Sequence, residues 1–424
     1  MIKLYNFDEL RPEEILNRDI RAEKNVEDVV DGIIAEVRAR GDEALKEYAL
    51  KFDGAKIDDL QVTQAEIDEA FANMDPYFLE TLREAAANIE SFHRQQVHKN
   101  FVINEKPGIV LGQKYTPIEK AGVYVPGGTA AYPSTVLMDV IPAKVAGVSE
   151  IVMTTPAGKD GRVNPVILAA TAGVTKIFKT GGAQAVAALA YGTQTIPAVD
   201  KIVGPGNIYV ATAKRKVFGK VGIDMIAGPS EILVLADGGC NPAWVAADLL
   251  SQAEHDKLAS PVLVTDSPAL ARAVQAELEV QIPQLPRAAI ARASVDDNGK
   301  IIVCTDLHKA IEACNIIAPE HLEVCVGDPF GVLNEIKNAG SIFLGRNVPE
   351  ALGDYFAGPN HTLPTSGTAR FSSPLGVDDF VKKSSFLYYT REALGEVAPR
   401  IADFAEREGL HAHAKSVTIR YEED

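Results

Sequence analysis

The sequence has little cysteine, no excess of positive charge and no long apolar run, and each absence excludes a class of protein. Four cysteines in 424 residues, without a CxxC spacing, argue against a disulfide framework or a cysteine-rich zinc site. The formal net charge of −16 argues against nucleic acid or an anionic membrane as the main partner. No apolar run is long enough to span a membrane and the N-terminus lacks a signal pattern, so we expect a cytoplasmic protein.

The dinucleotide-binding fingerprint GxGxxG is also missing, because Gly204-Pro205-Gly206-Asn207 has only its first two glycines. From Gly122 to Leu344 the chain instead alternates short apolar runs with helical patterns, such as a predicted strand at Glu150–Thr154 and a predicted helix from Pro165 to Ala172. Helical patterns before this region break at Gly41-Asp42 and at Pro76, and another helix is predicted from Arg391 to Arg407. Repeated units of strand, glycine turn and helix predict a parallel, doubly wound sheet. Ligands of such sheets bind at the carboxyl ends of the strands, where these glycine turns fall.

The length of the chain exceeds that of one ordinary core and favours several domains. We predict an α/β fold with two doubly wound, Rossmann-like parallel-sheet units, a helical N-terminal lead-in and a small C-terminal helical tail. The expected boundaries are 1–110 for the lead-in, which would pack on the second α/β unit, 111–230 and 231–375 for the two α/β units, and 376–424 for the tail.

Two pairs of polar residues are candidates for chemistry. Gln252 and His255 lie three residues apart at the end of a helical pattern, so they share one helix face and supply half of a metal site. Glu320 precedes His321, and a carboxylate beside an imidazole can divide two proton transfers in a cleft. Taken alone, the first pair is more often solvated surface, and the second is common by chance.

Glycine turns place further polar side chains where a ligand would bind. Gly181-Gly182-Ala183-Gln184 and Gly204-Pro205-Gly206-Asn207 each bring an amide to a helix start, where backbone N–H groups can hold phosphate or ribose. Turn glycines are nevertheless structural more often than not. Ser230 lies in the Gly-Pro-Ser turn between the two α/β units, a position that a ligand shared by both units would reach.

Taken together and in order, these motifs resemble the histidinol dehydrogenase family over nearly the whole chain. The most specific segments are Tyr124-Val125-Pro126-Gly127-Gly128, Ile223-Asp224, Ala227-Gly228-Pro229-Ser230-Glu231, Gln252-Ala253-Glu254-His255 and Pro319-Glu320-His321. The resemblance implies a zinc-dependent homodimer with shared active sites, cytoplasmic in bacteria, with one zinc ion per subunit. It implies oxidation of L-histidinol to L-histidine through the aldehyde with two NAD⁺ in succession, at the end of histidine biosynthesis.

The resemblance also assigns roles to residues of this sequence. Its zinc ligands fall on Gln252, His255, Asp354 and His413, and its acid/base pair falls on Glu320 and His321. Its NAD contacts fall on Tyr124, Gln184 and Asn207. Its substrate contacts fall on Ser230 and Glu408 and on Gln252, His255, His321, Asp354 and His413. In that family the tail packs on the partner subunit, so we expect Glu408 and His413 to complete the neighbouring chain's site and His411 to face solvent.

Three other functions remain open on the sequence. A related zinc and NAD⁺ dehydrogenase of another small amino alcohol or diol would keep the scaffold, although Ser230 and Glu408 favour histidinol. A zinc hydrolase would use Glu320 to activate water and would need no nicotinamide. A non-catalytic nucleotide-binding protein is disfavoured because four ligand-type residues and an acid/base pair coincide. A covalent aldehyde dehydrogenase needs an accessible thiol, and no cysteine lies in a polar motif.

Overall fold

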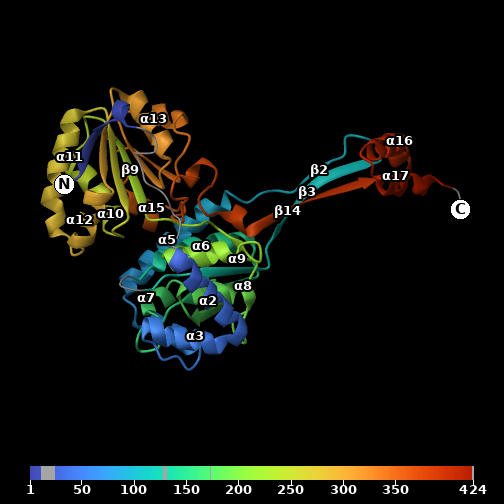
Figure 1. Cartoon of the computed structure of the whole chain (residues 1–424), viewed down its shortest axis with the longest axis horizontal. Coiled ribbons are helices and arrows are strands. Elements are labelled where there is room, and N and C mark those ends of the chain that lie inside the picture. Colours follow the sequence, from blue (N-terminus) through green and yellow to red (C-terminus); the bar gives the residue numbers. More distant parts are fainter. Residues whose placement is uncertain (11–23, 128–130, 172, 423–424) are drawn as a thin grey trace. The chain divides into compact units, whose positions relative to one another are not determined.

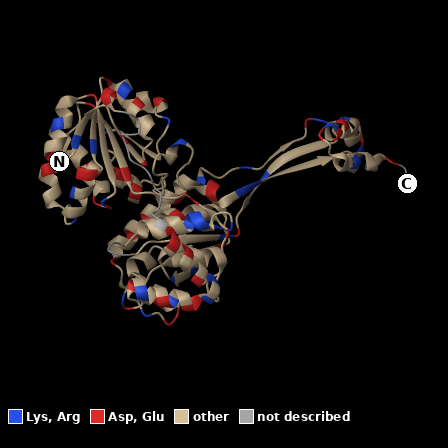
Figure 2. Cartoon of the chain, in the orientation of Figure 1, with Lys and Arg blue, Asp and Glu red and all other residues tan. Residues whose placement is uncertain are grey.

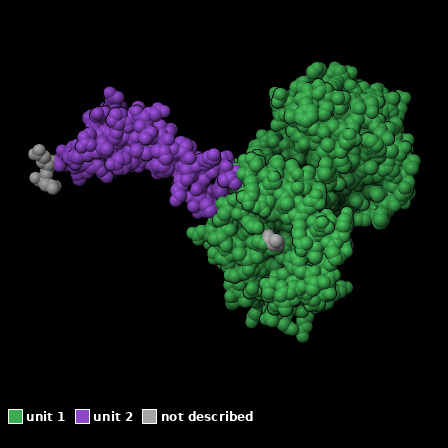
Figure 3. All heavy atoms as spheres, turned by 180° about the vertical axis from the view of Figure 1, so that it is seen from behind, with its two compact units in different colours: residues 1–96, 118–380 green, residues 97–117, 381–424 purple. Residues whose placement is uncertain are grey.

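The computed structural model describes residues 1–10, 24–127, 131–171 and 173–422, so Gly128 of the Tyr124–Gly128 motif lies outside the described residues. The chain forms two compact units, which Figure 3 distinguishes by colour. Unit 1 comprises residues 1–96 and 118–380, and unit 2 comprises residues 97–117 and 381–424. Unit 1 contains both predicted parallel sheets (Figure 1).

Within the described residues, the first sheet of unit 1 has five parallel strands in the order β6-β5-β4-β7-β8. Counted along the chain, this order is 3-2-1-4-5, which is a doubly wound arrangement. The strands are β4 (Lys120–Tyr124), β5 (Glu150–Thr155), β6 (Lys176–Lys179), β7 (Lys201–Val203) and β8 (Gly222–Ile223). The helices between them are α6 (Pro133–Ala146), α7 (Pro165–Leu168), α8 (Gly182–Tyr191) and α9 (Ile208–Val217).

Both faces of this sheet are buried, because successive strand residues point to opposite sides. Val152 packs into a core with α8 and α9, and its neighbour Met153 packs into a second core with α6 and α7. The N-terminal helices complete these two layers. They are α2 (Lys24–Arg40), α3 (Asp42–Tyr48), α4 (Gln64–Asn73) and α5 (Pro76–Arg94). The breaks at Gly41 and Pro76 fall where the sequence predicts them.

The position of the N-terminal lead-in differs from the prediction. We expected it to pack on the second α/β unit, but Val30, Ile33 and Val37 of α2 join the core of the first sheet, as do Leu82 and Ile89 of α5. The apolar stripe of an amphipathic helix shows that the helix is covered but does not show which sheet covers it. Among the described residues of the lead-in, β1 (Lys3–Asn6), which was not predicted, joins the second sheet by pairing with β11, and Ile2 and Phe7 pack into the cores of that sheet.

Within the described residues, the second sheet has six parallel strands in the order β1-β11-β10-β9-β12-β13. Without β1 this is again the order 3-2-1-4-5. The other strands are β9 (Glu231–Ala236), β10 (Ser260–Thr265), β11 (Lys300–Val303), β12 (His321–Cys325) and β13 (Ser341–Leu344). The helices are α10 (Pro242–Ala253), α11 (Pro268–Gln281), α12 (Ala288–Asp297), α13 (Leu307–Ile317), α14 (Pro329–Val332) and α15 (Glu350–Tyr355). The first three cover one face and α13 covers the other.

Unit 2 contains a three-stranded antiparallel sheet and two helices. Its strands are β2 (Phe101–Ile103), β3 (Ile109–Pro117) and β14 (Val381–Tyr389), and its helices are α16 (Arg391–Arg407) and α17 (His411–Thr418). The bounds of α16 match those of the predicted helix. The predicted tail, 376–424, is nevertheless not purely helical, because it also contains β14. Seven of the nine residues of β14 are exposed, so the segment has no buried face from which a strand could be predicted.

Burial and charge follow simple patterns in the described residues. The four cysteines are free and buried, as the sequence predicts. Lys and Arg are interspersed with Asp and Glu along the helices of unit 1 (Figure 2). Among the described residues, no helix combines the length and the apolar character needed to cross a bilayer.

Candidate active site

The predicted acid/base pair lies at the amino edge of the second sheet. His321 is the first residue of β12 and pairs in register with Ile232 of β9, which places Glu320 beside Glu231. Ala318 ends α13 with a φ of 49°, a left-handed conformation that is uncommon for residues other than glycine. This location corrects our expectation that both sheets present ligand sites at the carboxyl ends of their strands.

The backbone of Glu231 forms hydrogen bonds with both Glu320 and His321. The Nδ1 atom of His321 donates to the carbonyl oxygen of Glu231 at 3.0 Å, and the N–H of Glu231 donates to Oε2 of Glu320 at 2.8 Å. The hydrogen on Nδ1 fixes the tautomer of the neutral imidazole, so Nε2 carries the free lone pair. Nε2 is buried, makes no hydrogen bond to a described residue and lies 3.4 Å from Oδ1 of Asp354.

Burial and nearby charge shift the pKa of each of these groups. Burial raises the pKa of Glu320 to about 8. Burial opposes the charged form of His321, but the carboxylates of Glu320 and Asp354 outweigh it and raise the pKa of the imidazole to about 10. Burial also opposes ionisation of Asp354, but His321 holds the pKa of that carboxyl well below its usual range. Groups whose pKa is perturbed by burial and a specific partner are typical of catalytic sites.

Gln252 is hydrogen-bonded to Glu350, which lies next to Asp354. Gln252 lies in the last turn of α10, and its Nε2 atom donates to Oε1 of Glu350 at 2.6 Å. Glu350 and Asp354 lie four residues apart on α15, so they share one helix face. The Oε1 atom of Gln252 is buried and has no hydrogen-bond partner among the described residues. An orphaned amide oxygen next to two carboxylates is an arrangement that a cation would complete.

The residues present fit a zinc ion. One ligand atom each from His321, Glu350 and Asp354 lies within 4.8 Å of the other two. Of the predicted ligands, the structure brings Gln252 and Asp354 to this place through Glu350. His255 follows the end of α10 as an exposed residue, close enough to Asp354 and His321 for their charges to act on its imidazole. Glu408 and His413 belong to unit 2, where both are exposed, as is His411.

The sequence prediction missed Glu350. A carboxylate that precedes Asp354 by four residues was the available signal, because on a helix that spacing places two acids on one face. Ser230, in contrast, lies where we expected it, directly before β9, and its carbonyl oxygen accepts from the N–H of Ser260 at 2.9 Å.

The predicted NAD residues lie at the carboxyl edge of the first sheet. Tyr124 ends β4, and its hydroxyl oxygen accepts from the N–H of Gly182 at 3.1 Å; burial raises the pKa of this phenol to about 12. Gln184 is buried in the first turn of α8. Asn207 caps α9, with its Oδ1 atom accepting from Tyr209 and Val210.

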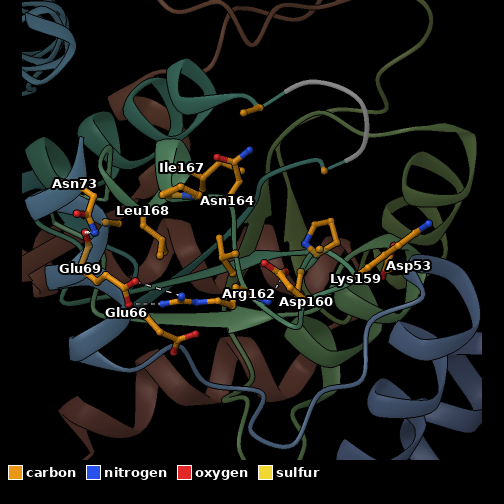
Figure 4. Close-up of a pocket in the computed structure, with 18 of the residues that line it drawn as sticks. Asp53, Glu66, Glu69, Asn73, Lys159, Asp160, Arg162, Asn164, Ile167 and Leu168 are labelled. Carbon is orange, nitrogen blue, oxygen red and sulfur yellow. Dashed lines mark hydrogen bonds and ion pairs between the residues drawn. The ribbon is translucent and has the colours of Figure 1, made fainter. Parts of the chain in front are cut away.

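A cavity of about 730 Å³ opens at the same edge of the first sheet (Figure 4). Gly127 and Pro156, which follow β4 and β5, line it, and Arg162 extends across it to pair with Glu69. None of the predicted zinc, acid/base or NAD residues lines this cavity. The acid/base centre is therefore identified by its side-chain geometry and not by the size of a pocket.

The fold and the site define a class of protein: an α/β enzyme with two doubly wound sheets and a buried imidazole–carboxylate centre that can hold a metal. The family model described as histidinol dehydrogenase matches residues 16–421. A histidinol dehydrogenase from Listeria monocytogenes is 55% identical over 419 residues, covering 97% of this chain and 98% of that protein. One from Bacillus subtilis is 58% identical over 393 residues, covering 92% of each.

The structure of histidinol dehydrogenase from Elizabethkingia anophelis matches with a TM-score of 0.94 and 38% identity, covering 99% of this chain and 98% of that one. The chain belongs to the histidinol dehydrogenase family.

Proposed function

We propose that this chain oxidises L-histidinol to L-histidine with NAD⁺, in histidine biosynthesis, at the centre around His321. Membership of the histidinol dehydrogenase family supports the reaction. The observation that supports the location is the hydrogen bond from His321 Nδ1 to the carbonyl of Glu231, which leaves Nε2 as a proton acceptor beside Asp354. The reaction proceeds through L-histidinaldehyde and consumes two NAD⁺.

In the first oxidation, hydride leaves the carbinol carbon of histidinol for NAD⁺ and Nε2 of His321, in the neutral form of the imidazole, takes the hydroxyl proton. A cation held by Asp354 would lower the pKa of His321 from about 10 and so favour that neutral form. The carbonyl of Glu231 keeps the imidazole in the required tautomer and orientation throughout. The carboxylate of Asp354, 3.4 Å from Nε2, stabilises the imidazolium that forms.

In the second oxidation, water adds to the aldehyde and the resulting hydrate loses hydride to a second NAD⁺. Glu320 takes the proton of the attacking water, because its pKa near 8 suits proton exchange close to neutral pH. Its Oε2 atom accepts from the N–H of Glu231. His321 again accepts the hydroxyl proton.

One Zn²⁺ per subunit would be held by Gln252, His255, Asp354 and His413. Two imidazoles, one amide and one carboxylate leave such an ion with a formal charge of about +1. When bound, the ion would polarise the alcohol oxygen and the carbonyl oxygen of the substrate. The same four residues, with Ser230, His321 and Glu408, would surround histidinol, and Tyr124, Gln184 and Asn207 would contact NAD⁺.

His413 and Glu408 would reach this site from a partner subunit in a two-fold dimer. The buried apolar residues of unit 2 are four alanines, and no residue of unit 2 joins a described core cluster. Large apolar side chains on its strands are exposed, among them Val102, Leu387 and Tyr388. A unit with so little core of its own requires a second surface to cover these side chains.

A steady-state assay with L-histidinol and NAD⁺ tests the reaction by counting NADH formed per histidinol consumed. We expect a limiting ratio of about two, since each of the two oxidations reduces one NAD⁺. A ratio of one with free aldehyde accumulating would contradict the four-electron reaction, and no NADH at all would favour a hydrolase.

Subunit complementation tests the shared site. A His321→Ala chain is mixed with a His413→Ala chain after reversible dissociation. If the site is shared, about a quarter of all sites recover, because half of the dimers are mixed and each of these has one intact site. Activity that stays at background despite verified exchange would mean that unit 2 serves its own subunit.

A further inference from the structure

Glu350 is a buried carboxylate that the proposed reaction does not use. Its side chain is 3% exposed and contacts two residues of α10. Oε1 accepts from Nε2 of Gln252 at 2.6 Å, and Oε2 accepts from the hydroxyl of Ser251. Its backbone N–H donates to Oε1 of Glu323 at 2.7 Å, which anchors the first turn of α15 to β12. Both carboxylate oxygens of Glu350 are therefore engaged by residues of α10.

These contacts determine which way the amide of Gln252 faces. Oε1 of Glu350 accepts the hydrogen bond, and the NH₂ group is the only donor of the Gln252 amide, so this group points toward Glu350. The Oε1 atom of Gln252 must then point the other way, where it is buried without a hydrogen-bond partner among the described residues. An amide nitrogen has no lone pair to offer a metal, so only this orientation presents a ligand atom.

We infer that Glu350 is a positioning residue, which orients the Gln252 amide so that its oxygen is offered to the metal before the metal binds. Since the proposed function supplies the zinc site, this role of Glu350 rests on it. Partners of this kind hold a ligand in its binding orientation and raise the affinity of the site without themselves binding the ion. Glu350 is close enough to Asp354 to be a direct ligand as well, so the experiment must separate the two roles.

Two substitutions at Glu350 separate orientation from charge. Glu350→Gln and Glu350→Met both remove the negative charge, but only Gln keeps an acceptor for Nε2 of Gln252. Its NH₂ group can donate to the Ser251 hydroxyl, which in turn donates to the carbonyl of Asp248 at 2.7 Å. Ser251→Ala is the matched control, because it removes the other hydrogen bond to the same carboxylate and leaves Gln252 oriented.

The full-length protein is stripped of metal and titrated with Zn²⁺ against a chromophoric chelator. We expect the Kd for zinc to rise about 10–100-fold in Glu350→Met. In Glu350→Gln we expect binding about tenfold tighter than in Glu350→Met, and in Ser251→Ala a Kd within about threefold of the unsubstituted protein. Equal weakening in Glu350→Gln and Glu350→Met would assign the effect to charge and overturn the orienting role, as would an unchanged Kd in Glu350→Met.

Cobalt separates orientation from ligation. At saturating Co²⁺ the visible d–d spectrum of each Glu350 variant should match that of the unsubstituted protein, because the set of ligands is the same. A changed spectrum would show that Glu350 is itself a ligand and would overturn the inference. If Glu350→Met fails to fold, as judged by circular dichroism of the metal-free protein, the spectrum and Kd of Glu350→Gln against those of Ser251→Ala decide the question.

Gln252→Met distinguishes failure of this inference from failure of the proposed function. Unchanged zinc binding in Gln252→Met would remove Gln252 from the ligand set and with it the proposed zinc site. Loss of zinc in Gln252→Met combined with unchanged binding in Glu350→Met would overturn only the role of Glu350.

Discussion

Apart from β1, the two parallel sheets of unit 1 have the same strand order, but their candidate functional residues lie at opposite edges. In the first sheet Tyr124 ends β4 and Asn207 follows β7, at the carboxyl edge where doubly wound sheets bind ligands. In the second sheet Glu320 and His321 lie at the start of β12, and Ser230 directly precedes β9. Strand order alone therefore does not decide which edge of a sheet carries the chemistry.

At the carboxyl edge of the second sheet, polar groups of the loops are bonded to one another. Asp237, which follows β9, accepts from the N–H groups of Gly239 and Gly327 at 2.9 and 2.7 Å and pairs with Arg346 at 2.6 Å. These contacts tie together the chain segments that follow β9, β12 and β13. These polar groups are paired with one another, whereas the buried Nε2 atom of His321, at the opposite edge, has no hydrogen-bond partner among the described residues.

The carboxyl edge of the first sheet is instead held by a buried ion pair. Lys214 of α9 pairs with Asp224 and also donates to the carbonyl of Gly204 at 2.9 Å, while Asp224 accepts from the N–H of Gly204 at 2.9 Å. Burial and Asp224 raise the pKa of the adjacent Asp139 to about 8, so Asp139 is protonated at neutral pH. This network anchors the backbone of the Gly204–Asn207 turn on its buried side. The solvent-facing side of the turn stays accessible.

The largest expected effect tests whether proton transfer and NAD⁺ binding take place at separate edges. His321→Asn removes the proposed proton acceptor at the second sheet, so we expect kcat with histidinol to fall about 10²–10⁴-fold. The affinity for NAD⁺, whose proposed site is at the first sheet, should stay within about twofold. Steady-state kinetics and a fluorescence titration with NADH measure the two. A large loss of nucleotide affinity would mean that the two edges are not separate sites.

The two ion pairs should differ in their contribution to stability. Lys214→Met leaves the buried carboxylate of Asp224 without its partner, and we expect a loss of about 3–5 kcal/mol in the free energy of unfolding. Arg346→Met breaks a pair whose side chains are 36% and 25% exposed, and we expect at most about 1 kcal/mol. Urea denaturation compares them. Similar losses in the two variants would contradict the contrast between the edges.

Two glycines in equivalent positions give a finer test. Gly204 follows β7 with a φ of +120°, and a Cβ atom there would lie 2.1 Å from the carbonyl oxygen of Tyr124. Gly204→Ala should therefore destabilise the turn by about 1–3 kcal/mol and raise the KM for NAD⁺. Gly327 follows β12, and its Cβ atom would meet its nearest neighbour at 3.8 Å.

The Gly327→Ala variant is the control, with an expected change within about 0.5 kcal/mol and an unchanged KM. A Gly204→Ala enzyme with unaltered KM for NAD⁺ would show that this turn does not bind the nucleotide.

The smallest expected effect is a pH dependence at a contact between the helices of the first sheet and the segment after α15. His93 of α5 is fully buried, donates from Nδ1 to the carbonyl of Ile89 at 2.8 Å, and has Nε2 3.5 Å from the amide of Asn360. Burial lowers the pKa of His93, so the unfolded chain, with an ordinary pKa of about 6.5, takes up the proton first.

The stability that neutral His93 contributes is therefore complete above pH ~6.5 and is lost as the pH falls below that value. The slope is at most about 1.4 kcal/mol per pH unit. The His93→Gln variant should lose less stability than the unsubstituted protein between pH 7 and 5, measured by urea denaturation at each pH. Parallel pH profiles for the two proteins would show that His93 titrates normally in the folded state.

Elements with strong local patterns were predicted closely from the sequence. The strand predicted at Glu150–Thr154 is β5 (Glu150–Thr155), and the helix predicted at Arg391–Arg407 is α16 with the same bounds. Pro165 begins a helix as predicted, but α7 ends at Leu168, and Ala172, the predicted end, lies outside the described residues. Strands without a buried face, such as β14, left no such pattern.

The sequence by itself determined the class of fold and pointed to the candidate acid/base pair and the candidate amide and imidazole ligands, because apolar periodicity and adjacent polar residues are properties of a short stretch of chain. Only the tertiary structure decided that the lead-in helices cover the first sheet, that β1 joins the second, and that Glu350 holds the amide of Gln252. The tertiary structure also decided that Glu320 and His321 lie at the amino edge of the second sheet. These outcomes depend on contacts between separate helices, strands and turns, and local pattern does not encode which other segment a buried face will meet.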